Sequence, residues 1–293
     1  MSMAAIKLSA CKILPGKIMK RFQLAVFSTA FALAVSVALA ATSTNVHPIV
    51  DAQSGYLLGG SKNGKWLSAQ EIAKVLKGGE EYSVYKNDAI AGKTTGSKTR
   101  TIDAPCEETQ WVTLKKNFNG VLGVSGIGNP IPRRKVSQNV DQKIYRDEVA
   151  KILKAGKIKN PKVVISQLWR VDLDGDKVDE VLLSATRYAN PRRENPQPFY
   201  ISSNANAGDH SLVLLRKIIK GKVQTIIMAS EIYAQSKEFS APNVHRLAGV
   251  YDLNGDGKME ILMNSRYYEG DAMSVIEVDG ATAREVLSAG CGA

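Results

Sequence analysis

Two nine-residue stretches of this chain share one arrangement of acidic residues and glycine. Asp172–Glu180 reads DLDGDKVDE, and eighty positions later Asp252–Glu260 reads DLNGDGKME. Each stretch runs directly into a short apolar segment, Val181–Ala185 in the first case and Ile261–Ser265 in the second. Short apolar runs bounded by turn residues are typical of buried strands. Both stretches are therefore predicted to be oxygen-rich loops that lead into strands.

Oxygen ligands recur at the same five positions of both loops. Positions 1, 3, 5 and 9 carry a side-chain oxygen, and position 7 can turn its backbone carbonyl inward. The predicted ligands are Asp172, Asp174, Asp176, Val178 and Glu180 in the first loop and Asp252, Asn254, Asp256, Lys258 and Glu260 in the second. Calcium takes about six to eight oxygen ligands in flexible geometry, whereas magnesium prefers a rigid octahedron and retains its waters. The spacing therefore predicts Ca²⁺ in each loop.

Two other interpretations apply to the same residues. The helical calcium loop begins with a similar pattern but requires Glu at position 12. Leu183 and Met263 stand there, so that loop type is excluded. Clusters of Asp, Asn and Gly also form ordinary turns, because their side chains bond the local backbone. This metal-free alternative remains open for either loop.

Both segments resemble the FG-GAP and VCBS class of calcium-loop repeats, known from the blades of integrin-type propellers and from many secreted bacterial proteins. The resemblance implies a loop at a blade turn that binds calcium through its first, third, fifth, seventh and ninth residues. Gly257 matches the tight turn of that class, whereas the first loop has Lys177 there. The class usually has Asp at position 9, where both loops here have Glu.

The expected fold class is mainly β (α+β), with antiparallel blade-like sheets, two calcium-loop turns and two helices in the N-terminal half. A capping box at Ser68–Glu71 begins one helix, which Gly78 and Gly79 end, and an apolar face predicts another over Asp141–Leu153. Trp111–Leu114 is predicted to be a strand and Lys93–Lys98 a flexible turn. The predicted domains are a signal peptide (1–40), a small N-terminal β/α subdomain (41–105) and a β-rich domain with two repeats (106–293).

Residues 1–40 contain five basic residues, no acidic residue and an apolar run that ends Ala38-Leu-Ala40. This pattern predicts a secretory signal cleaved after Ala40, and so a periplasmic or secreted protein with no membrane span after cleavage. An uncleaved membrane anchor is the alternative, because the run nearly spans a bilayer. Met19 is an alternative start.

Without those five basic residues, the excess of basic over acidic residues falls from +11 to +6. So modest an excess makes nucleic acid an unlikely partner. The basic segment Arg133–Lys135 is predicted to be a solvated loop. A surface that binds anionic polymers remains a third functional alternative.

Cys106 and Cys291 are the two cysteines left after signal cleavage, which would remove Cys11. An even pair in an exported chain predicts a disulfide. In the entropic model, closing so long a loop stabilises the fold by up to about 5 kcal/mol.

The leading functional hypothesis is an exported, non-enzymatic calcium-binding protein that holds a binding or scaffold surface for an unknown protein or polysaccharide. No nucleophile elbow or phosphate-binding loop occurs, and the spacing of His47, His210 and His245 suggests no zinc site. The alternative is a hydrolase of an envelope or extracellular polymer, with Glu269 or Asp271 in the segment Arg266–Asp271 near the chemistry.

Overall fold

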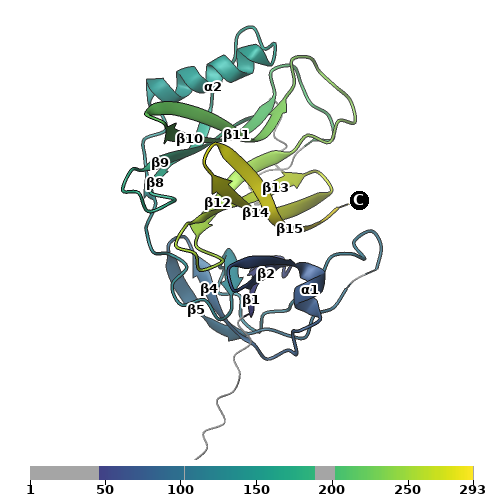
Figure 1. The fold of residues 1–293 in the computed structure, drawn as a ribbon. Helices are drawn as coiled ribbons and strands as arrows, with labels where there is room; N and C mark the ends of the chain where they lie inside the picture. The colour runs from purple at the N-terminus through teal and green to yellow at the C-terminus, as the bar shows by residue number, and fades with distance from the viewer. Residues whose placement is uncertain (1–45, 102, 189–201, 293) are drawn as a thin grey trace, which may run out of the picture. The chain divides into compact units, whose positions relative to one another are not determined.

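A computed structural model describes residues 46–101, 103–188 and 202–292. These residues form three antiparallel sheets and two helices, joined by loops (Figure 1). The prediction of a mainly β fold with antiparallel sheets is confirmed. The predicted signal peptide (1–40) lies outside the described residues. Neither helix in the described ranges combines the length and the apolar character that a membrane crossing requires.

The first sheet has the strand order β3-β2-β1-β6-β4-β5. Helix α1 (Ala69–Ala73) follows β3 directly, and Ser68 and Glu71 form a reciprocal capping box at its start. Although β6 lies beyond residue 105, it pairs with β1 and β4, so this sheet draws on both predicted domains. The strands are β1 (Val46–Asp51), β2 (Leu57–Lys62), β3 (Lys65–Ser68), β4 (Glu81–Lys86), β5 (Ala89–Thr95) and β6 (Leu122–Val124).

The two acidic stretches each join the first two strands of one repeat. Asp172–Glu180 (loop 1) connects β8 to β9 in the second sheet, and Asp252–Glu260 (loop 2) connects β12 to β13 in the third. The second sheet has the order β11-β10-β9-β8-β7, with β7 (Val136–Ser137), β8 (Ile165–Val171), β9 (Glu180–Arg187), β10 (His210–Ile219) and β11 (Lys222–Ile232). The third has the order β12-β13-β14-β15, with β12 (Val244–Tyr251), β13 (Glu260–Tyr267), β14 (Gly270–Asp279) and β15 (Thr282–Cys291).

The third sheet lies between the other two and is buried on both faces (Figure 1). Along β13, Leu262 packs toward the first sheet, while Ile261 and Met263 pack toward the second. Successive side chains of a strand point to opposite faces, so a strand covered on both sides needs an uninterrupted apolar run. This requirement explains the Ile-Leu-Met segment that follows loop 2.

Helix α2 (Lys143–Ala155) covers the outer face of the second sheet. Its buried residues Val149 and Leu153 lie four positions apart and so share one helix face. They pack against Leu168, Leu183 and Leu212, which come from three neighbouring strands.

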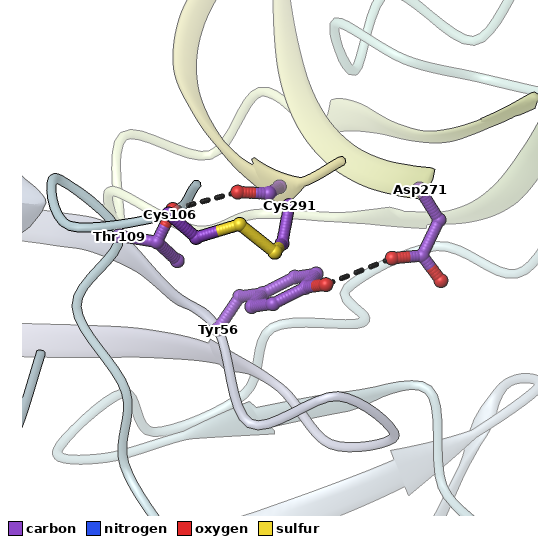
Figure 2. Close-up of a disulfide and its surroundings, with 6 residues drawn as sticks. Tyr56, Cys106, Thr109, Asp271 and Cys291 are labelled. Carbon is purple, nitrogen blue, oxygen red and sulfur yellow. Dashed lines mark hydrogen bonds between the residues drawn. A yellow bond between two sulfur atoms is a disulfide. The ribbon is translucent and has the colours of Figure 1, made fainter. Parts of the chain in front are cut away.

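A disulfide joins the end of β15 to the segment that follows the first strands (Figure 2). Cys106 and Cys291 have Cα atoms 5.5 Å apart, although 185 positions separate them in sequence. Beside them, the Thr109 hydroxyl donates to the Gly290 carbonyl at 2.6 Å, and the Tyr56 hydroxyl donates to Asp271 Oδ1 at 2.9 Å (Figure 2). The connection between β5 and β6 is therefore linked to the third sheet by a disulfide and a hydrogen bond, and Tyr56, just before β2, adds a second hydrogen bond.

Candidate metal centre

Loop 1 and loop 2 fold around their own side chains through the same five hydrogen bonds. In each loop, the carboxylate at position 1 accepts from the backbone N–H groups at positions 4 and 6. The side chains at positions 3 and 5 accept from positions 5 and 7, and Glu at position 9 accepts from position 2. All ten donor–acceptor distances lie between 2.7 and 3.3 Å. The two loops therefore have the same local geometry.

Both loops turn through two residues in the left-handed region. Gly175 and Gly255 at position 4 have φ of 82° and 78°. At position 6, Lys177 has φ of 70° and Gly257 has φ of 86°. Only glycine adopts this region without steric cost, so loop 1 contains a strained residue where loop 2 does not.

The predicted ligands of loop 1 are brought together in part. Asp172, Asp174 and Asp176 each offer an oxygen, and these three atoms lie within 4.8 Å of one another, so the cluster can hold a metal ion. Glu180 is 2% exposed, and its Oε2 accepts from the Leu173 N–H. Val178 at position 7 is an exposed residue.

Lys217, which belongs to no motif in the sequence, contacts two of these ligands. Its ammonium nitrogen lies 2.5 Å from Asp174 Oδ2 and 2.8 Å from Glu180 Oε1. Burial opposes ionisation of Asp174, but the hydrogen bond and charge of Lys217 outweigh it and lower the pKa of that carboxyl. Burial likewise opposes the charge of Lys217, yet its two carboxylate partners raise its pKa above the ordinary value.

Loop 2 has no such partner. Within the described ranges, no Lys, Arg or His nitrogen forms an ion pair with Asp252, Asp256 or Glu260. Asn254, the fourth predicted side-chain ligand, is 6% exposed, and Lys258 at position 7 is exposed. Burial, followed by the charges of Asp256 and Asp252, raises the pKa of Glu260 to about 8. No cation from the part of the chain that the structure describes therefore pairs with the carboxylates of loop 2.

Arg133 connects the two loops. Its guanidinium donates to the carbonyls of Asp172 and Leu173 in loop 1 and to that of Gly257 in loop 2, at distances from 2.5 to 2.9 Å. Lys135 forms an ion pair with Asp88 and lies 4.9 Å from the centroid of the Trp169 ring. The segment Arg133–Lys135 is a loop, as predicted, and Arg134 is exposed. The prediction that it is solvated is wrong for Arg133 and Lys135, which are partly buried and bind carbonyls and an aromatic ring.

The segment proposed for hydrolase chemistry lines a cavity of about 490 Å³ beside the disulfide. Asp271 faces this cavity together with Glu107 and Glu108. One oxygen of Asp271 accepts the hydrogen bond from Tyr56 that links two sheets (Figure 2). This contact gives Asp271 a structural role.

Comparison with protein-family models, curated proteins and solved structures finds no match to this chain.

Proposed function

We propose that the protein is an exported calcium-binding protein whose acidic loops stabilise a β-rich module, which binds a protein or polysaccharide or serves as a scaffold. The observation that carries this proposal is the place of each loop between two sheets. Leu173 of loop 1 is buried between the second and third sheets, and Leu253 of loop 2 is buried between the third and the first. An ion that fixes either loop would fix a contact between sheets.

Hydrogen bonds to equivalent carbonyls connect loop 1 to loop 2 and loop 2 to the first sheet. The Leu173 carbonyl accepts from the Met259 N–H at 2.8 Å, and the Leu253 carbonyl accepts from the Ser61 hydroxyl at 2.9 Å. Both carbonyls belong to position 2 of their loop. Because position 2 also donates its N–H to Glu at position 9, the acidic side chains hold the residue that joins the sheets.

The donor chemistry supports a hard cation. Carboxylate, amide and carbonyl oxygens are the only candidate ligands in either loop, and such ligands suit calcium, magnesium and manganese rather than copper or zinc. Several carboxylates within a short loop repel one another, and a bound divalent ion would remove that repulsion. The Cys106–Cys291 pair supports the exported part of the proposal, since disulfides persist in oxidising compartments.

Thermal unfolding of the signal-free chain with calcium, with magnesium and with chelator tests the proposal. An ion that binds the folded state alone stabilises it by about 2.7 kcal/mol at a hundredfold excess over Kd. For a chain of this size, that gain corresponds to a rise in Tm of roughly 5–10 °C. Calorimetric titration should show the matching heat of binding. The same Tm in millimolar calcium and in chelator would contradict the proposal.

A further inference from the structure

The pairing of strands gives Lys217 a counterpart in the other repeat. Loops 1 and 2 end at the equivalent residues Glu180 and Glu260, and each leads into a hairpin with the following strand. In the first hairpin, β9–β10, Leu182 lies opposite Leu215. In the second, β13–β14, Leu262 lies opposite Val275. Two residues closer to the loop on each strand, the same register places Lys217 beside Glu180 in the first hairpin and Glu277 beside Glu260 in the second. The two repeats therefore have opposite charges at this position.

The contacts of these two residues differ accordingly. Lys217 turns its side chain, which is 10% exposed, into loop 1 and binds Asp174 and Glu180. Glu277 accepts from Trp66 Nε1 at 3.2 Å and from Arg284 at 2.6 Å, and the charge of Lys258 in loop 2 also acts on it. Lys217 thus forms ion pairs with two loop 1 carboxylates, whereas no basic side chain in the described ranges forms an ion pair with a loop 2 carboxylate.

A cavity of about 140 Å³ lies at this position, and both loops line it. Glu260, which is 2% exposed, faces this cavity together with Asp256 and Glu277. Lys258 also lines it, but it forms no ion pair with a loop 2 carboxylate. A carboxylate removed from water either keeps a proton or pairs with a cation. The cavity, which Asp174 and Lys217 also line, has room for a cation with water ligands.

We infer that Lys217 is a built-in counter-cation of loop 1, and that loop 2 alone takes an exchangeable calcium ion in the native chain. This inference rests on the proposed function and assigns its site. The ammonium of Lys217 occupies two of the oxygens that a calcium ion in loop 1 would need. In loop 2 the Asn254 amide stands where loop 1 has the Asp174 carboxylate, and its Nδ2 donates to Asp256 Oδ2 at 3.2 Å. No ammonium from the described ranges pairs with the carboxylates of this loop.

Calorimetric titration with calcium, together with unfolding in calcium and in chelator, tests the inference on the signal-free chain. The native chain should bind one ion, and Asp256→Asn should abolish that binding. Lys217→Met removes the charge but keeps the apolar stem. This variant should bind a second ion, and calcium should restore the Tm that it loses in chelator. Lys258→Met, which removes the other lysine of the cavity, should still bind one ion.

The reciprocal variant Glu277→Lys places an ammonium beside loop 2 and keeps the inference testable if Lys217→Met does not fold. It should bind no calcium, and its Tm should not respond to chelator. Two ions in the native chain, or one ion in Lys217→Met with no recovery of Tm in calcium, would overturn the assignment. Continued calcium binding by Glu277→Lys would do the same. Absence of calcium binding by both the native chain and Lys217→Met would instead contradict the proposed function.

Discussion

Gln167 binds the backbone of Leu247 with both ends of its side-chain amide. Its Nε2 donates to the Leu247 carbonyl at 2.8 Å, and its Oε1 accepts from the Leu247 N–H at 3.0 Å. The two residues lie eighty positions apart, which is the offset between the two loops. Equivalent positions of the two repeats are therefore in direct contact, and this contact fixes β12 of the third sheet against β8 of the second.

We expect Gln167→Ala to lower the free energy of unfolding by about 1–3 kcal/mol, because a buried backbone carbonyl loses its donor. Denaturant unfolding measures this loss. Gln224→Ala, at an exposed position of β11, is the matched control and should change stability by less than about 0.5 kcal/mol. Equal effects of the two substitutions would show that the amide contributes nothing between the sheets.

Gly257→Ala should destabilise the chain by about 1 kcal/mol, because φ at this position lies in the left-handed region. The added methyl group meets no atom within 4 Å, so the cost is conformational. Lys177→Ala is the control at the equivalent position of loop 1, where a Cβ is already present, and should change stability little. Both variants are compared in chelator, so that metal binding does not contribute. A neutral Gly257→Ala would argue against equivalent loop geometry.

Replacing both Cys106 and Cys291 by Ser should lower stability by up to about 5 kcal/mol in the entropic model, because the disulfide closes a loop of 185 residues. Unfolding is followed with and without a thiol reductant. The reductant should destabilise the native chain and leave the double variant unchanged. Insensitivity of the native chain would mean that the two thiols are not joined in solution.

Between about pH 7.5 and about pH 5.5, the buried histidines should contribute a loss of stability on acidification. Glu260 contributes in the opposite direction, because its raised pKa of about 8 stabilises the folded state as the pH falls. Burial lowers the pKa of His210 and of His245 below the ordinary value of 6.5. In the unfolded chain these rings take up protons near pH 6.5, whereas in the folded chain they take them up only at lower pH, so their contribution to stability falls as the pH drops through that value. His210→Gln should reduce this pH dependence in denaturant unfolding. A variant with the same pH dependence as the native chain would refute the contribution of His210.

The shape of the loops could be predicted from the sequence because every bond that forms it is local. Each carboxylate in loop 1 accepts from a backbone group no more than seven positions away. The pattern DxDGD therefore specifies the turn before any tertiary contact forms. The capping box at Ser68 could be predicted for the same reason, since its partners lie three positions apart.

The charge partner of loop 1 could not be predicted in this way. Lys217 lies 37 positions from Glu180, and only the pairing of β9 with β10 brings the two together. Arg133 is likewise 124 positions from Gly257, whose carbonyl it binds. A lone basic residue in a sequence gives no signal of such a contact.

Two local predictions failed for a related reason. Part of the turn predicted over Lys93–Lys98 belongs to β5, a largely exposed edge strand without the apolar alternation that marks a half-buried one. Trp111–Leu114, predicted to be a strand, makes only isolated bridges with Tyr56, Gly96 and Arg100. Whether each segment forms a strand depends on the segment that pairs with it. The β-propensity of its own residues does not determine that partner.

The strands of the third sheet, Val244–Cys291, come last along the described chain. This sheet can therefore form only after the other two have been synthesised. Until the third sheet forms, the apolar face that the first sheet packs against it is exposed to solvent, and so is the corresponding face of the second sheet. A chain that is synthesised or translocated from its N-terminus would thus expose two apolar surfaces during most of that process. Removal of the strands of the third sheet would leave the first and second sheets with exposed apolar faces, which favour self-association.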